Sequence, residues 1–201
     1  VVKVLLIKRN NEPYKDSWAL VGGALYNNED LNTGVMREIK EKTGIKKIDL
    51  QLADVHGKVD RSPVMRMVAI SYMGVIDNQR VTLIKKTLKT NDAEWFNIKD
   101  VESMSLAYDH AEIIKSTFEK LKKQISKSNI LKSLFPDKFT MPELQKTYEA
   151  ILGVSLDRRN FRRRILNLNL VEDTNEYLNF EGKKPAKLYR FKEHIEEKNI
   201  F

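Results

Sequence analysis

Acidic side chains that could hold a metal ion gather around one predicted helix of this 201-residue chain. The pattern predicts that helix over residues 32–43, and Glu38 and Glu41 share one face of it because they stand three residues apart. Carboxylates that share a helix face in this way can hold a hard divalent cation against a diphosphate. An isolated pair of helix glutamates more often only solvates a surface, so the pair alone does not establish a site.

Lys42 stands on the same helix face, directly after Glu41. Its ammonium repels a divalent cation at contact distance, where a carboxylate would attract one. We therefore expect Mg²⁺ binding by Glu38 and Glu41 to be weak or lost, and any catalytic role of these two glutamates to be vestigial.

A second group of candidate functional residues is a run of five arginines within residues 158–164, which also contains Asn160. Phe161, Ile165 and Leu168 recur at helical spacing and predict the buried face of a helix, so the polar side chains must point elsewhere. Arginine pairs with phosphates and guanine edges, and asparagine pairs with adenine edges. The candidate DNA contacts are Arg158, Arg159, Asn160, Arg162 and Arg163.

The elements around this helix predict a small winged helix-turn-helix domain. Thr140 and Glu143 form a capping-box pattern that starts a preceding helix, and Gly153 is a natural C-cap for its end. Asp157 is the expected N-cap of the arginine-rich helix. Two strand-like pieces follow, and the loop between them, the expected wing, carries two candidate contacts to the DNA backbone, Lys183 and Lys184.

The first half of the chain mixes strand and helix patterns. Residues 1–8 and 67–76 are strand-like, and residues 109–127 predict a helix that closes the first domain. The polar segment 126–129 lacks apolar periodicity and marks a junction. We therefore predict an α+β fold with two domains, residues 1–127 and 128–201.

Composition narrows the partners and the compartment. The formal net charge of +8 suits a polyanion such as DNA, although charge alone does not establish one. The chain contains no cysteine, which excludes disulfides and thiolate metal sites and fits a reducing cytoplasm. Its apolar runs are too short to cross a bilayer, so we expect no membrane partner.

Residues 22–45 resemble the Nudix box, the signature of a large family of diphosphate hydrolases. The chain departs from that pattern only at Lys42, where the family has a metal-binding glutamate. The resemblance implies an α/β/α sandwich with a mixed sheet, a role for Arg37 in orienting Glu29, and Mg²⁺ as the cofactor of any remaining hydrolysis; with Lys42 present, we expect no cofactor to be required. The matching positions are Gly23, Glu29, Arg37, Glu38, Ile39, Glu41, Gly44 and Ile45.

Shorter segments of the same half resemble relatives that act on ADP-ribose, in particular residues 17–23, 60–63 and 106–110. This resemblance implies that the effector contacts Trp18, Arg61 and Arg37. Core packing is the alternative for Trp18. A hydrogen bond at a helix start is the alternative to acid/base chemistry for His110.

Residues 139–191 resemble the winged-helix domain of the Nudix-related transcriptional regulators, in which a Nudix-like sensor precedes a DNA-binding tail. The resemblance implies a homodimeric repressor that binds double-stranded DNA. It also implies a small effector, which is ADP-ribose, a phosphoribosyl compound or a sugar such as arabinose, and control of genes for NAD-related or pentose metabolism.

Two other functions remain open from the sequence. An active Nudix hydrolase of ADP-ribose or another nucleoside diphosphate derivative would use Glu38 and Glu41 as catalytic metal ligands, and Lys42 is the residue against it. An RNA-binding adaptor would use the arginine-rich helix. The lack of interleaved aromatic residues on the surface of that helix argues against stacking on single strands.

Overall fold

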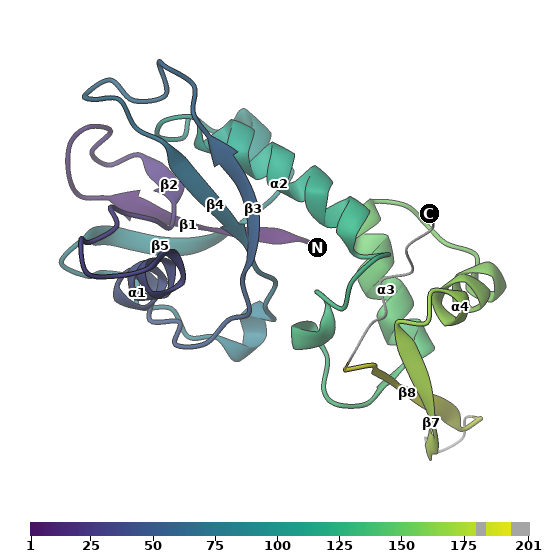
Figure 1. Cartoon of the computed structure of the whole chain (residues 1–201). Helices are drawn as coiled ribbons and strands as arrows, with labels where there is room; N and C mark the ends of the chain where they lie inside the picture. Colours follow the sequence, from purple (N-terminus) through teal and green to yellow (C-terminus); the bar gives the residue numbers. More distant parts are fainter. Residues whose placement is uncertain (180–183, 194–201) are drawn as a thin grey trace. The chain divides into compact units, whose positions relative to one another are not determined.

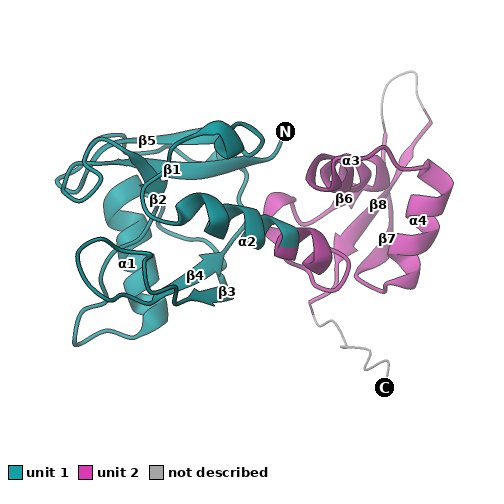
Figure 2. Ribbon diagram, turned by 90° about the horizontal axis from the view of Figure 1, so that it is seen from above, with its two compact units in different colours: residues 1–119 teal, residues 120–201 magenta. Residues whose placement is uncertain are grey.

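The computed structural model describes residues 1–179 and 184–193 and divides into two compact units, residues 1–119 and 120–201 (Figure 2). The division falls inside helix α2 (His110–Gln124), before the junction that the sequence placed near residue 127. Residues 120–124 of this helix belong to the second unit, within which the hydroxyl of Tyr148 donates a 2.5 Å hydrogen bond to the carbonyl of Ile125.

The centre of the first unit is a three-stranded sheet of order β2-β1-β5 (Figure 1). Its strands β1 (Lys3–Arg9), β2 (Trp18–Leu20) and β5 (Thr90–Asn97) pair antiparallel. Consecutive residues of a strand point to opposite faces, and Leu6 and Ile7 are both fully buried in separate core clusters. Both faces of this sheet are therefore covered, as in a layered α/β domain.

A second, two-stranded sheet pairs β3 (Gln51–His56) with β4 (Ala69–Met73). Helix α1 (Leu31–Thr43) packs against β5, and 3-10 turns cover Asn78–Arg80 and Asp100–Ser103. Among the described residues, the parallel component of the expected mixed sheet is a bridge between Trp18 and Leu106. No helix in the described part of the chain is long and apolar enough to span a bilayer.

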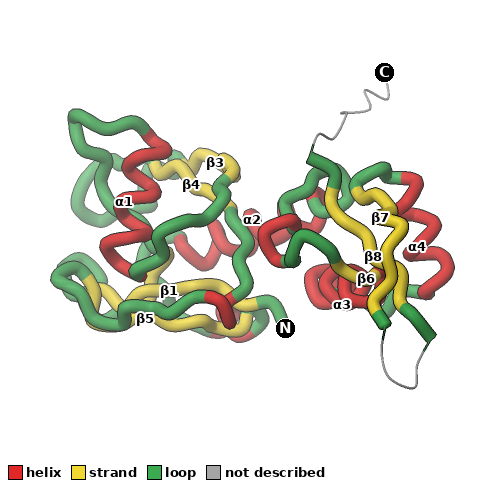
Figure 3. The backbone as a smooth tube through the Cα atoms, turned by 90° about the horizontal axis from the view of Figure 1, so that it is seen from below, coloured by secondary structure: helices red, strands yellow, loops and turns green. Residues whose placement is uncertain are grey.

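The second unit joins two helices to a three-stranded antiparallel sheet of order β6-β8-β7, with α4 beside the sheet in Figure 3. A 3-10 turn at Lys132–Leu134 precedes these elements. Their bounds are β6 (Phe139–Thr140), α3 (Met141–Leu152), α4 (Arg158–Asn167), β7 (Val171–Leu178) and β8 (Ala186–Phe191). The expected helix-turn-helix followed by two strands is confirmed.

The cap residues explain where the two helices begin and end. The backbone N–H of Thr140 donates to the Glu143 carboxylate at 2.7 Å, so the predicted capping box starts α3, and Gly153 ends it at a φ of 71°. Asp157 accepts a hydrogen bond from the N–H of Asn160 at the start of α4. The expectation that Leu168 is buried was wrong: it is 40% exposed because α4 has ended, and Leu170, at 2%, enters the core instead.

Candidate functional site

Helix α1 presents the carboxylates of the Nudix-like segment. Asp30 caps its first turn by accepting a 2.7 Å hydrogen bond from the N–H of Thr33. Gly44 ends the helix in the left-handed region, at a φ of 80°. Between these caps the helical repeat places Glu38, Glu41 and Lys42 on one side, as the sequence predicted.

Arg37 ties this helix to the loop before it. Its guanidinium donates to both carboxylate oxygens of Glu29, at 2.6 and 2.8 Å, and to the carbonyl of Ala24 at 3.0 Å. It also lies over the ring of Tyr26, 3.8 Å from the ring centre. The hydrogen bond from Arg37 lowers the pKa of Glu29 to about 2, so this carboxylate stays ionised. The two hydrogen bonds between Arg37 and Glu29 therefore hold the loop in place.

Two lysines contact the glutamates that the sequence assigned to metal binding. Lys42 Nζ lies 2.9 Å from Glu38 Oε2 and also donates to the carbonyl of Gly22. Lys89 Nζ donates to Glu41 Oε2 at 2.7 Å and lies 3.8 Å from Glu38 Oε1. Lys89 was missed by the sequence analysis because it lies outside the Nudix-like segment, among other lysines, with no spacing that relates it to α1.

Glu38 is the most enclosed member of this group. Its side chain is only 7% exposed, and a Cβ added at Gly23 would lie 2.4 Å from its carboxylate atoms, so any larger residue there would have to displace this carboxylate. Burial raises the pKa of Glu38, but the hydrogen bonds from Lys42 and Arg37 outweigh it and leave the pKa lowered. The carboxylate is therefore ionised and neutralised by cations of its own chain.

We define the Nudix cluster as the side chains that meet here, namely Glu29, Arg37, Glu38, Glu41, Lys42 and Lys89. Its three carboxylates and three cations sum to zero charge. The donor set does not fit Mg²⁺, since an ammonium or a guanidinium already contacts each carboxylate. In the described part of the chain, no group of three or more acidic or histidine side chains is placed to hold a metal ion.

The residues expected to contact the effector outside this cluster occupy different surroundings. Trp18 packs edge to face on Phe96 in the core cluster around Leu6, with ring centres 4.6 Å apart. Arg61 is buried and donates to both carboxylate oxygens of Asp109, at 2.8 and 3.1 Å. This pair fixes the loop after β3 to the start of α2.

His110 accepts a 3.0 Å hydrogen bond from the backbone N–H of Leu20 at its Nδ1 atom. An accepting Nδ1 requires the neutral ring. Burial lowers the pKa of His110 to about 4, which agrees with that state. The imidazole therefore joins β2 to the start of α2.

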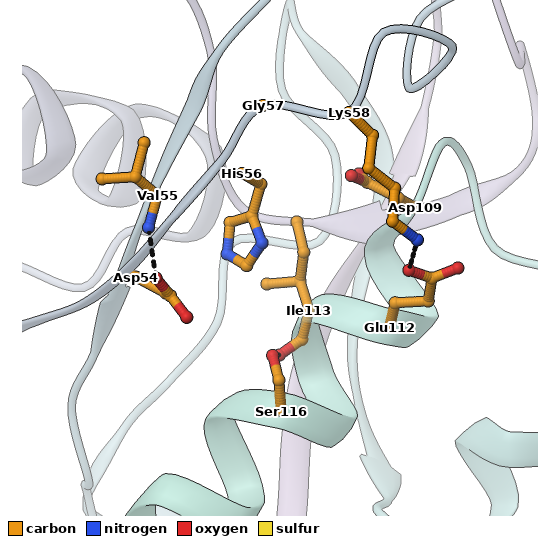
Figure 4. Close-up of a pocket in the computed structure, with 9 residues that line it drawn as sticks. All are labelled: Asp54, Val55, His56, Gly57, Lys58, Asp109, Glu112, Ile113 and Ser116. Atoms are coloured by element: carbon orange, nitrogen blue, oxygen red, sulfur yellow. Dashed lines mark hydrogen bonds and ion pairs between the residues drawn. The ribbon is translucent and has the colours of Figure 1, made fainter.

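A shallow cavity of about 300 Å³ opens beside that helix start (Figure 4). His56 and Ile113 face it from β3 and α2, and the ion pair of Lys58 with Glu112 closes one side. The ring of His56 is held by a 2.9 Å hydrogen bond to the hydroxyl of Ser71. Asp109 lines the cavity while it is paired with Arg61, so the cavity and the Arg61 loop form one structural region.

Helix α4 of the second unit carries the arginines. Phe161 and Ile165 are buried, and Phe161 packs edge to face on Tyr148 of α3. The turn between the helices is held by α3: Gln145 donates to the carbonyl of Leu156 and Glu149 accepts from the N–H of Leu156, both at 2.8 Å. These contacts fix the angle at which α4 leaves the turn.

The polar side chains of α4 divide into two sets. Arg162 donates a 3.1 Å hydrogen bond to the hydroxyl of Tyr189 on β8, so it is partly engaged in holding the helix to the sheet. Arg163 donates to Asn160 at 3.0 Å, and Arg158 and Arg159 are exposed. Of the two lysines expected in the wing, Lys184 is exposed and Lys183 lies outside the described residues.

The chain matches two family models in series. The NUDIX domain model matches residues 2–117, and the model of the NrtR DNA-binding winged helix domain matches residues 131–191. The "ADPR responsive transcriptional repressor NtrR" of Acinetobacter baylyi is 33% identical over 192 residues, which cover 94% of this chain and 76% of that protein.

Solved structures agree with this order of domains. The structure of Shewanella oneidensis NrtR complexed with a 27mer DNA is 29% identical and has a TM-score of 0.76, covering 94% of this chain and 86% of that one. The NUDIX domain of the same protein complexed with ADP ribose is 28% identical, with a TM-score of 0.55, and covers 59% of this chain and 77% of that one.

The buried His110 predicts a pH dependence of stability. The ordinary pKa of 6.5 applies in the unfolded chain and about 4 in the folded one, so the unfolded chain binds more protons between these values. The free energy of unfolding should therefore fall as the pH drops from 6.5 to 4. His110→Asn keeps an acceptor but removes the titration, so urea unfolding should show a flatter profile over this range. An equal slope in both proteins would contradict the assignment.

Proposed function

This chain belongs to the Nudix-related transcription regulators that carry an NrtR winged helix, and we propose that it is a DNA-binding repressor whose Nudix domain binds ADP-ribose. The observation that carries the DNA-binding half is the exposed face of α4. Phe161 and Ile165 anchor that helix in a helix-turn-helix, and all five of its arginines are exposed, together with Asn160.

The helical repeat supports a proposal for which side chains read bases. At about 100° per residue, Arg159, Asn160 and Arg163 lie opposite the buried pair Phe161 and Ile165. Arg163 also donates a hydrogen bond to Asn160, which orients both side chains in the protein without DNA. We assign base contacts to these three residues and contacts to the DNA backbone to Arg158, Lys183 and Lys184.

Arg162 has a different role in this proposal. Its bond to Tyr189 joins the recognition helix to β8, the strand that leads out of the wing loop. We therefore treat Arg162 as a positioning residue that holds helix and wing in register, with its remaining N–H groups available to phosphates.

ADP-ribose is the effector that the first unit supports best. The NUDIX domain of a relative was solved with ADP ribose, and the cations of the Nudix cluster suit the ligand's diphosphate. ADP-ribose derives from NAD, which points to genes of NAD-related metabolism as the targets. The effector can act only if it binds two states of the protein differently, because equal affinity would shift no equilibrium.

Hydrolysis of that ligand should be weak or absent. Lys42 places a cation on Glu38, and Lys89 places another on Glu41, so neither glutamate is free to bring Mg²⁺ to a diphosphate. A protein that acts on genomic DNA works in the compartment that holds it, which for a bacterial-type regulator is the cytoplasm.

We further propose a homodimer, and the face of β3 and β4 supports it. The cross-strand pairs Leu52–Tyr72 and Val55–Ile70 share one face of this sheet. Leu52 and Val55 are each 57% exposed and Ile70 is 38% exposed. An apolar sheet face open to water is stabilised by pairing with a second copy.

Substitutions on α4 test the DNA-binding half. Arg159→Ala and Arg163→Ala should each weaken binding to duplex DNA from upstream of the protein's own gene by about 1–3 kcal/mol and relax base specificity. Fluorescence polarisation with specific and scrambled duplexes measures both effects. Arg80→Ala removes an exposed arginine of the first unit and is the matched control. Unchanged affinity in both α4 variants would refute the assignment of α4 as the recognition helix.

A substitution on the apolar face tests the dimer. Leu52→Lys should shift the protein from dimer to monomer in light scattering after size exclusion, because it buries an unpaired charge in the interface. Leu88→Lys is the control, since Leu88 is 99% exposed elsewhere in the same unit. A wild-type monomer at micromolar concentration, or a dimer that Leu52→Lys leaves intact, would contradict this interface.

Replacing Lys42 by the glutamate of the family tests whether Lys42 is the reason that hydrolysis is weak or absent. Lys42→Glu should increase Mg²⁺-dependent hydrolysis of ADP-ribose over the wild type, measured as release of AMP. The reason is that it removes the ammonium from Glu38 and adds a carboxylate. If the variant gains no activity, Lys42 is not the residue that disables the cleft.

A further inference from the structure

The ammonium groups of the Nudix cluster lie among oxygen atoms of the kind that bind a metal ion. Lys42 Nζ joins a backbone carbonyl, that of Gly22, to a carboxylate, that of Glu38, and its side chain is only 12% exposed. Carbonyl and carboxylate oxygens are the hard donors that Mg²⁺ also takes. The ammonium thus occupies a cation position lined by oxygen atoms.

Lys89 completes the arrangement from outside the Nudix-like segment. Its ammonium contacts Glu41 at 2.7 Å and approaches Glu38 at 3.8 Å, so the two lysines together reach both glutamates. The hydrogen bond that Lys89 donates to Glu41 is the main reason that the pKa of Lys89 is raised, and the side chain therefore stays charged. It is 40% exposed, which leaves it open to a ligand.

We propose that Lys42 and Lys89 replace the divalent metal ion of this fold, so that the diphosphate of the effector binds without metal. Each ammonium has three N–H donors, and the contacts to Gly22, Glu38, Glu41 and Tyr26 use two on each lysine. One donor on each lysine remains for phosphate oxygens. The identity of the ligand rests on the proposed function, whereas the metal-free binding mode rests on the cluster itself.

The net charge of the Nudix cluster determines whether it can hold a divalent cation. The wild-type cluster has three carboxylates and three cations, so it neither repels a diphosphate nor retains negative charge that could hold a dication. Lys42→Glu gives four carboxylates and two cations, a charge of −2, which one Mg²⁺ would neutralise. That variant should therefore bind the diphosphate only when a divalent cation is supplied.

Calorimetry of ADP-ribose binding in EDTA and in Mg²⁺ tests this on the full-length protein. The wild type should bind with the same affinity in both buffers, within about twofold. Lys42→Glu should bind at least about tenfold more weakly in EDTA, because like charges then face the diphosphate, and should regain affinity in Mg²⁺. Lys40→Glu, an equal charge change at an exposed position of the same helix, should behave as the wild type.

A measurement without the nucleotide gives a second, independent readout. Electron paramagnetic resonance of Mn²⁺ should show no tight site on the wild type and one on Lys42→Glu. Lys89→Met should weaken ADP-ribose binding in both buffers, because it removes a donor without creating a metal site.

The outcomes separate the two proposals. Wild-type binding that needs Mg²⁺, or a tight Mn²⁺ site on the wild type, would overturn the metal-free mode and leave ADP-ribose as the effector. Absence of ADP-ribose binding by the wild type in both buffers would overturn ADP-ribose as the effector, and the Mn²⁺ measurement would then decide whether the lysines exclude a metal ion.

Discussion

The balance of charge around Glu38 is the interaction on which the first unit depends. A carboxylate this enclosed is costly unless cations meet it, and here Arg37 and Lys42 contact its two oxygens. The same Arg37 holds Glu29, and so the loop that precedes α1. In this arrangement the segment that would bind metal in a hydrolase becomes a structural anchor. Lys89, whose side chain is 40% exposed, is the cation of this cluster that a ligand can reach most readily.

In the second unit, helix α4 must stay packed on the domain while its arginines remain exposed. Phe161 and Ile165 bury one side of α4, and the contacts of Gln145 and Glu149 to Leu156 fix the turn before it. Arginines can then crowd the opposite side because they face solvent, where the proposed function places DNA. A sensor unit and a reading unit of this kind together account for an effector-responsive repressor.

The sequence predicted those elements of the fold and the site that depend on residues close together in the chain. The capping box at Thr140, the N-cap at Asp157 and the Nudix-like spacing each depend on residues close in the chain, and the elements they predicted were found. Lys89 could not be predicted, because its contact with Glu41 joins residues 48 positions apart through the packing of β5 on α1. The burial of Arg61 against Asp109 was missed for the same reason.

The most direct test of the account is to titrate the complex of wild-type protein and upstream duplex DNA with ADP-ribose in a buffer containing EDTA. Polarisation of the labelled DNA reports the affinity. The account predicts that ADP-ribose changes the affinity for DNA by at least about fivefold without any divalent metal. DNA affinity that ADP-ribose leaves unchanged, or changes only after Mg²⁺ is added, would contradict it.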